Sequence, residues 1–244
     1  MTLTSSTKIN PSDRIIYALD FSSTKDACQE IDRIYPEIVF FKVGLELFLA
    51  SGWEVVDYII HKGGKVMLDL KFLDIPATVA SAVKQVNQHQ GISLLTVHGH
   101  KQTIEAAVAA RENQSLQILG VTLLTSFGPS DMLELVGQDN FIKPQDLVLA
   151  RAKSSLDAGA DGLVASAMEA KQLRQSLSQN HGSDFVLVTP GIRLLATAID
   201  KDDQQRIATP QEALAQGSDY LVIGRPIRTA KDPIAIIQSI KALL

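Results

Sequence analysis

Residues 66–90 read Val-Met-Leu-Asp-Leu-Lys-Phe-Leu-Asp-Ile-Pro-Ala-Thr-Val-Ala-Ser-Ala-Val-Lys-Gln-Val-Asn-Gln-His-Gln and hold one strand followed by one helix. The run from Val66 to Leu70 is nearly all apolar, as expected for a strand of a parallel sheet that helices cover. Residues 77–90 follow an amphipathic pattern, which predicts a helix. The stretch therefore predicts one strand–helix unit of an α/β fold.

Eight such runs occur along the chain, each short and rich in β-branched residues or leucine. They span residues 15–19, 38–43, 66–70, 94–97, 118–124, 162–164, 185–188 and 220–223. Amphipathic stretches such as residues 22–34 and 102–111 lie between them, and Ser22 or Ser23 is placed to cap the first helix. Eight units in 244 residues predict an α/β fold of the (β/α)8 TIM barrel type, with a doubly wound open sheet as the alternative.

No linker or shift in composition divides the chain, so we expect a single domain. The barrel is expected to occupy residues 13–244, and the polar residues 1–12 are expected to form a flexible N-terminus. Hydrophobic residues make up 45% of the chain and charged residues 20%, which is enough for a sizeable core and argues against disorder.

Composition also argues against several classes of function. The net charge is -4 and no basic stripe stands out, so nothing favours nucleic-acid binding. No apolar run reaches the roughly 20 residues of a membrane helix, and the N-terminus lacks the apolar core of a signal peptide. A single cysteine rules out an intrachain disulfide. We therefore expect a cytoplasmic protein without a nucleic-acid or membrane partner.

Polar side chains collect where the predicted strands end, which in a parallel barrel is the edge that carries the active site. They are Asp20, Lys42, Asp69, Lys71, His98, Thr125, Arg193 and Arg225. Asp69 and Lys71 stand two apart on one strand, so their side chains leave the same face. With Lys42 from the adjacent strand and Asp74 from the following loop, they can form an alternating array that keeps every member charged. A purely structural ion network is the alternative interpretation.

The ends of the last two predicted strands have the composition of a phosphate site. They read Thr-Pro-Gly-Ile-Arg at residues 189–193 and Ile-Gly-Arg-Pro at residues 223–226. Glycines let backbone amides approach an anion, arginines bind it bidentately, and the loops after strands 7 and 8 usually hold phosphate in this fold. Two long connections, residues 126–144 and 194–205, are predicted to be lids or binding loops.

No metal and no cofactor is expected. The sequence contains no P-loop, no Gly-x-Gly-x-x-Gly fingerprint and no Gly-x-Ser-x-Gly elbow. No second histidine or carboxylate is spaced to bind a metal together with His98. A structural and a catalytic role for His98 both stay open.

Five strings occur here in barrel order: Ala-Leu-Asp (18–20), Phe-Lys-Val-Gly (41–44), Asp-Leu-Lys-Phe-Leu-Asp-Ile-Pro (69–76), Thr-Pro-Gly-Ile-Arg (189–193) and Ile-Gly-Arg-Pro (223–226). Together they resemble the orotidine 5′-phosphate decarboxylase family, from about residue 13 to the C-terminus. The Asp-x-Lys-x-x-Asp motif alone is shared with related barrel enzymes. Its combination with Lys42 and both phosphate loops is highly specific.

The resemblance implies a stand-alone, bacterial-type carboxy-lyase that converts orotidine 5′-phosphate to UMP and CO2. This reaction is the last step of de novo pyrimidine nucleotide synthesis and needs no metal or cofactor in that family. The implied catalytic tetrad is Lys42, Asp69, Lys71 and Asp74. In the family the second aspartate of the motif crosses a dimer interface. Asp74 and Thr78 are therefore expected to serve the neighbouring subunit's site in a homodimer.

The resemblance also implies the substrate contacts. Asp20 and Lys42 are expected to bind the ribose hydroxyls, and Thr125 the pyrimidine edge. The residues expected to bind the phosphate are Arg193, Gln204, Gly224 and Arg225. Gln205 is the alternative to Gln204.

Loss of CO2 from C6 of the pyrimidine leaves a carbanion with no adjacent carbonyl to delocalise it, so the protein must stabilise that charge. We expect Lys71 to do so and then to protonate C6, with Asp69 beside the leaving carboxylate. One rival is a Mg²⁺-dependent barrel enzyme acting on an open-chain sugar phosphate, against which Lys42 argues because it would repel the metal. The other rival is a non-catalytic nucleotide-binding or scaffold protein.

Overall fold

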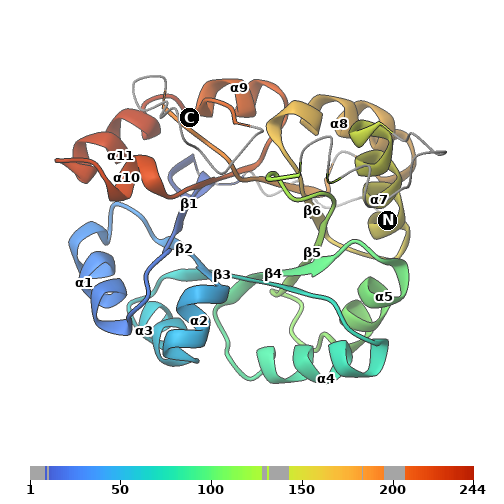
Figure 1. Ribbon diagram of the computed structural model, residues 1–244, viewed down its shortest axis with the longest axis horizontal. Coiled ribbons are helices and arrows are strands. Elements are labelled where there is room, and N and C mark those ends of the chain that lie inside the picture. Colours follow the sequence, from blue (N-terminus) through green and yellow to red (C-terminus); the bar gives the residue numbers. More distant parts are fainter. Residues whose placement is uncertain (1–8, 10, 128–130, 132–142, 183, 195–206) are drawn as a thin grey trace, which may run out of the picture.

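The computed structural model describes residues 9, 11–127, 131, 143–182, 184–194 and 207–244. Its eight strands are all parallel and form a closed barrel in the order β1 to β8, with helices around the outside (Figure 1). The predicted TIM barrel is therefore confirmed, and the open sheet is wrong. Most of the predicted flexible N-terminus, residues 1–12, lies outside the described residues.

The strands agree with the eight predicted runs to within a few residues. They are β1 Ile15–Ala18, β2 Phe40–Gly44, β3 Lys65–Phe72, β4 Ile92–His98, β5 Gln117–Val121, β6 Gly162–Val164, β7 Val186–Thr189 and β8 Tyr220–Ile223. The fifth strand ends three residues earlier than predicted. Its partner β6 is only three residues long and pairs with residues 119–121, so the ladder ends there.

Helices follow the strands and cover the outer face of the barrel. Those in the described part of the chain are η1 Pro11–Arg14, α1 Thr24–Ile34, α2 Leu45–Ser51, α3 Glu54–His61, α4 Pro76–Val86, α5 Lys101–Ala110, α7 Pro144–Asp157, α8 Ala167–His181, α9 Pro210–Ala215, α10 Arg225–Arg228 and α11 Pro233–Lys241. Of the two serines that could cap α1, Ser23 does so by accepting a hydrogen bond from the Asp26 amide. In the described residues no helix is long and apolar enough to cross a membrane.

The barrel interior holds an apolar layer contributed by residues from all eight strands. It includes Ile16, Phe40, Met67, Leu94, Leu119, Val164, Val188 and Val222. Because strand side chains alternate between faces, the next inward positions toward the carboxyl ends lie two residues further on. On three neighbouring strands these positions are Lys42, Asp69 and Thr96. The same period that fills the core therefore places a polar layer directly above it.

Candidate active site

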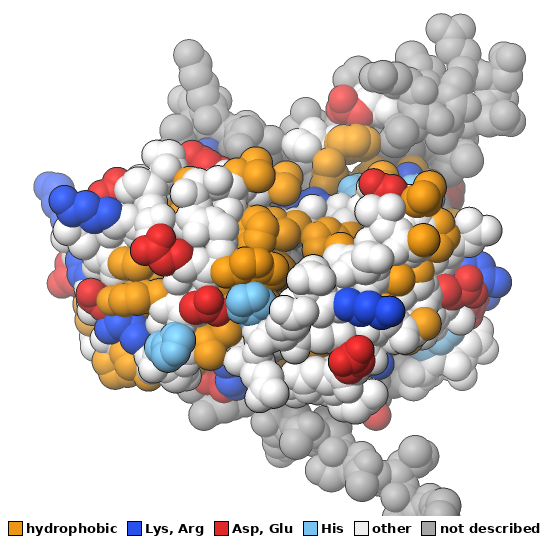
Figure 2. Space-filling view, turned by 90° about the horizontal axis from the view of Figure 1, so that it is seen from below, with side chains coloured by type: hydrophobic (Ala, Val, Ile, Leu, Met, Phe, Trp, Pro, Cys, Tyr) orange, Lys and Arg blue, Asp and Glu red, His pale blue; other side chains and the backbone are white. Residues whose placement is uncertain are grey.

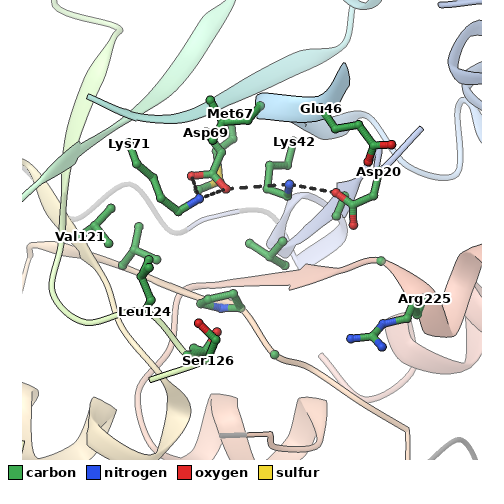
Figure 3. A pocket seen from close by; sticks show the side chains of 18 of the residues that line it. Asp20, Lys42, Glu46, Met67, Asp69, Lys71, Val121, Leu124, Ser126 and Arg225 are labelled. Carbon is green, nitrogen blue, oxygen red and sulfur yellow. Dashed lines mark hydrogen bonds and ion pairs between the residues drawn. The ribbon is translucent and has the colours of Figure 1, made fainter. Parts of the chain in front are cut away.

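Four charged side chains form a continuous array in the barrel mouth, one from the loop just after β1, one from β2 and two from β3 (Figure 3). The Lys42 ammonium lies 3.2 Å from an Asp20 carboxylate oxygen and 3.8 Å from Asp69 Oδ2. The Lys71 ammonium donates to both Asp69 oxygens, at 2.9 and 3.0 Å. The order Asp20, Lys42, Asp69, Lys71 alternates in sign, so each charge has an opposite neighbour.

Asp69 is the centre of this array and its carboxylate is only 13% exposed. Burial alone would raise the pKa of the Asp69 carboxyl, because it disfavours the charged form. The ammonium groups of Lys42 and Lys71 and the hydrogen bonds from Lys71 and Thr96 outweigh burial and hold this pKa below its usual range. Asp69 is therefore a carboxylate at neutral pH, fixed among cations.

The backbone at Lys71 departs from a regular strand, so the prediction that regular alternation brings its side chain to the face of Asp69 is wrong. Lys71 has a φ of 49°, in the left-handed region that residues other than glycine rarely adopt. The ladder between β3 and β4 is irregular over Leu68 to Phe72. Simple alternation along a strand therefore does not aim the Lys71 side chain, and a bulge does.

The array forms one wall of a cavity of about 920 Å³. Much of the remaining lining is apolar and includes Met67, Val121, Leu123, Leu124, Val164 and Val222. Thr125 also lines the cavity and is buried. Apolar side chains beside a charged array lower the local dielectric constant, which strengthens the electrostatic interactions there.

The predicted phosphate residues meet at the same cavity, away from the array. Gly191, Arg193, Gly224 and Arg225 all line it, and Figure 3 shows Arg225 on the side opposite Lys71. Gly191 has a φ of 79°, a conformation that glycine adopts without steric cost. Gln204 and its alternative Gln205 lie outside the described residues, as do most residues of the two predicted binding loops.

Asp74 and Thr78 lie apart from the cavity of their own chain. Asp74 is exposed and its Oδ1 accepts a hydrogen bond from the Ile75 amide at 2.7 Å. Thr78 is also exposed, on the first turn of α4. Neither residue lines the cavity. The member of the array that joins Lys42, Asp69 and Lys71 within one chain is Asp20.

Comparison with known proteins gives the family. A family model described as orotidine 5′-phosphate decarboxylase / HUMPS family matches residues 13–240. The chain belongs to this family. Its membership confirms the expected enzyme class, since its curated relatives are named for a carboxy-lyase.

Two of these relatives are named orotidine 5′-phosphate decarboxylase. The one from Neisseria gonorrhoeae (strain NCCP11945) is 44% identical over 230 residues, which cover 93% of this chain and 90% of the relative. The one from Hydrogenovibrio crunogenus is 42% identical over 240 residues, covering 96% and 97%.

Solved structures with a similar fold include one with the same name and one without an assigned function. Orotidine 5′-phosphate decarboxylase from Lactobacillus acidophilus is 34% identical and superposes with a TM-score of 0.78, covering 95% of this chain and 98% of that chain. An uncharacterized conserved protein from Geobacillus kaustophilus is 29% identical with a TM-score of 0.77, covering 94% and 99%.

Two side chains that contact residues of the charged array were not predicted from the sequence. Thr96, on β4, donates to Asp69 and accepts from the Lys71 amide. Arg228, at the end of α10, lines the cavity and donates to the Asp20 carbonyl. Neither belongs to a motif, although Thr96 stands two residues before His98 at a predicted strand end. His98 itself is half-buried and does not line the cavity.

The donor set does not favour a metal ion. In the described part of the chain no three His, Cys, Asp or Glu side chains are grouped to hold one. The carboxylates of Asp20 and Asp69 instead face Lys42 and Lys71, whose positive charges would repel a divalent cation.

Proposed function

We propose that this protein decarboxylates orotidine 5′-phosphate to UMP and CO2, without a metal or a cofactor. The observation that carries the proposal is the alternating array from Asp20 to Lys71, which borders a cavity that also contains Arg193 and Arg225. A nucleotide monophosphate has matching parts: a phosphate for the arginines and a reacting ring for the array. Family membership supports this assignment.

The proposed substrate lies across the cavity. The phosphate is bound by Arg193, Gly224 and Arg225, together with Gln204. Asp20 and Lys42, which are already paired at 3.2 Å, bind the ribose hydroxyls. The buried Thr125 contacts the pyrimidine edge. This orientation brings C6 and its carboxylate to Asp69 and Lys71.

The proposed chemistry uses the charge of Lys71 twice. When the bond between C6 and the carboxylate breaks, CO2 leaves and the electron pair stays on C6. The Lys71 ammonium, fixed by Asp69 at 2.9 Å, stabilises that charge without having to reorganise, and then transfers a proton from Nζ to C6. Asp69 lies beside the leaving carboxylate and disfavours the bound ground state by like-charge proximity.

Metal independence is tested by a single assay. We expect orotidine 5′-phosphate to be consumed at the same rate with and without excess EDTA, followed by ultraviolet absorbance, because lysines supply the positive charge. Loss of activity that added Mg²⁺ restores would contradict metal independence. Absence of turnover under both conditions would favour the two rivals, the Mg²⁺-dependent sugar-phosphate enzyme and the non-catalytic nucleotide-binding protein.

The phosphate contact is tested by Arg225→Ala. A hydrogen bond to a charged group contributes about 1.5–3 kcal/mol, so kcat/KM for orotidine 5′-phosphate is expected to fall by at least about tenfold. The loss is expected even though the phosphate is remote from the reacting bond, because its binding energy helps to assemble the site. Lys231→Ala, an exposed cation just beyond α10, is the matched control. A change within about twofold would contradict the assignment.

We further propose a homodimer in which Asp74 and Thr78 complete the site of the neighbouring subunit. Both residues are exposed, and large apolar side chains beside Asp74 are exposed too: Leu73 by 55% and Ile75 by 66%. Leu49 on α2 is 81% exposed, and Figure 2 shows hydrophobic side chains gathered in the middle of the face seen from the α4 side. Contiguous apolar surface of this kind is typical of a protein interface.

The proposal places the enzyme in the cytoplasm. Its one cysteine, Cys28, is a free thiol, which fits a reducing compartment.

A further inference from the structure

Thr96 occupies the one position on β4 that faces the bulge of β3. The two strands pair Leu68 with Leu95 and then Phe72 with Val97, so residues 69–71 of β3 stand opposite Thr96 alone. The Thr96 side chain points into the barrel and is fully buried. A buried hydroxyl in this place must be hydrogen-bonded or it destabilises the fold.

The hydroxyl of Thr96 is used in both directions. Its proton is donated to Asp69 Oδ1 at 2.9 Å, and its oxygen accepts the Lys71 amide at 3.0 Å. The two partners are the two reacting residues of the proposed site, and they lie on the same strand. A single side chain from the neighbouring strand therefore connects the carboxylate of one to the backbone of the other.

The bond to the Lys71 amide matters because the backbone there is strained. A φ of 49° brings Cβ close to the carbonyl oxygen, and lysine adopts it only where surrounding contacts hold it. Thr96 supplies such a contact at the residue itself. The bulge also sets where the Lys71 side chain leaves the strand, so this contact determines where the ammonium lies.

We infer that Thr96 is a positioning residue of the proposed decarboxylation, which holds the Asp69 carboxylate and the left-handed Lys71 backbone in the geometry that the reaction needs. It does not touch the substrate, since it does not line the cavity. Its effect is carried by Asp69 and Lys71. This inference rests on the proposed function.

Thr96→Val is the direct test, because valine keeps the branched shape and removes only the hydroxyl. Loss of one charge-assisted hydrogen bond and of the support at Lys71 is expected to lower kcat by about 10- to 100-fold. KM for orotidine 5′-phosphate is expected to change by less than about threefold, because the ribose and phosphate contacts remain. Thr96→Ser, which retains the hydroxyl, is expected to restore most of kcat.

The pH profile gives a readout that a merely structural threonine would not move. The groups that face Asp69 are the ammoniums of Lys42 and Lys71 and the Thr96 hydroxyl, and Asp20 follows next to Lys42. The Thr96 hydroxyl bonds the ionised form, so it lowers the pKa of Asp69. Its removal raises that pKa, and the acid limb of kcat/KM is expected to move to higher pH in Thr96→Val and to stay in Thr96→Ser.

A matched control distinguishes the specific effect of Thr96 on Asp69 and Lys71 from the general effect of losing a buried hydroxyl. Thr122 is also fully buried and donates to the Val164 carbonyl at 2.9 Å, but it contacts neither Asp69 nor Lys71. Thr122→Val is expected to lower Tm as Thr96→Val does, while kcat and the pH profile stay close to those of the wild type. If Thr96→Val does not fold, Thr96→Ala replaces it and carries the same expectations.

Two results would overturn the inference: a Thr96→Val enzyme whose kcat and acid limb match those of the wild type, or Thr122→Val and Thr96→Val losing activity equally.

Failure of the proposed function is distinguishable, since it requires that the wild-type chain itself does not turn over orotidine 5′-phosphate. In that case ¹³C NMR of the Asp69 carboxyl still tests the position of Thr96. The carboxyl titration is expected to shift to higher pH in Thr96→Val, and an unchanged titration contradicts the inference.

Discussion

Lys71→Ala is expected to lower kcat/KM for orotidine 5′-phosphate by at least about 10⁴-fold, because electrostatic stabilisation and proton transfer each contribute about 10²-fold or more. Both depend on one ammonium, which Asp69 holds at 2.9 and 3.0 Å. The measurement is the turnover of orotidine 5′-phosphate at high enzyme concentration. Binding of UMP, followed by calorimetry, is expected to survive, because Arg193 and Arg225 line a different part of the cavity.

The matched control is Lys65→Ala on the same strand. Lys65 begins β3, at the end of the barrel opposite to the array. Its ammonium pairs with the Asp13 carboxylate at 2.8 Å. Its replacement removes a lysine from β3 without touching the proposed chemistry, so turnover is expected to stay near that of the wild type. A Lys71→Ala enzyme that binds UMP and retains substantial turnover would refute the proposed role of Lys71.

Asp74→Asn is expected to lower kcat/KM by at least about 10²-fold, the scale of losing one placed electrostatic group. Asparagine keeps the side-chain oxygen that accepts the Ile75 amide, so the loop is retained and only the charge is lost. This variant alone does not say which subunit's site Asp74 serves. A mixing experiment does.

The Lys71→Ala and Asp74→Asn variants are each expected to be nearly inactive. Equal amounts of the two are mixed and allowed to exchange subunits. In a two-fold dimer that shares Asp74 across its interface, random exchange gives about half heterodimers, each with one intact site, and so about one quarter of wild-type activity. If Asp74 served its own chain's site, both sites of every heterodimer would lack one group. Absence of recovery after proven exchange would therefore contradict the shared site.

Much of the fold could be predicted from the sequence, because the pattern of apolar and amphipathic segments that indicates it extends along the whole chain. Eight apolar runs separated by amphipathic stretches predict eight strands and the barrel, and errors of a few residues at the ends, as at β5, leave the topology unchanged. The exact ends of the strands could not be predicted as accurately, because a strand ends where the neighbouring strand stops pairing with it. The three-residue β6 sets the end of β5, and no residue of β5 itself carries that information.

The candidate site also has a part that could be predicted from the sequence and a part that could not. Charges are costly inside a barrel unless they are paired, so residue type and spacing predicted an array of Lys42, Asp69, Lys71 and Asp74. Within one chain the fourth member is Asp20 instead, and Asp74 lies exposed away from the cavity. Thr96 and Arg228 could not be found in that way, because a threonine in an apolar strand and an arginine in a short helix are unremarkable by type. Only their contacts, to Asp69 and Lys71 and to the Asp20 carbonyl, identify them.

The sequence by itself determined the eight strand–helix units and the chemical groups at the strand ends, since periodicity and residue type are local properties of the chain. Closure of the strands into a barrel, rather than an open sheet, was decided by the tertiary structure. The tertiary structure alone decided how Asp69 and Lys71 face one another. Regular alternation predicts that they share a face, but Lys71 lies in a left-handed bulge, and its position depends on a hydroxyl from β4. A backbone bent against its own preference is held by contacts from residues distant in sequence, and those contacts exist only once the sheet has closed.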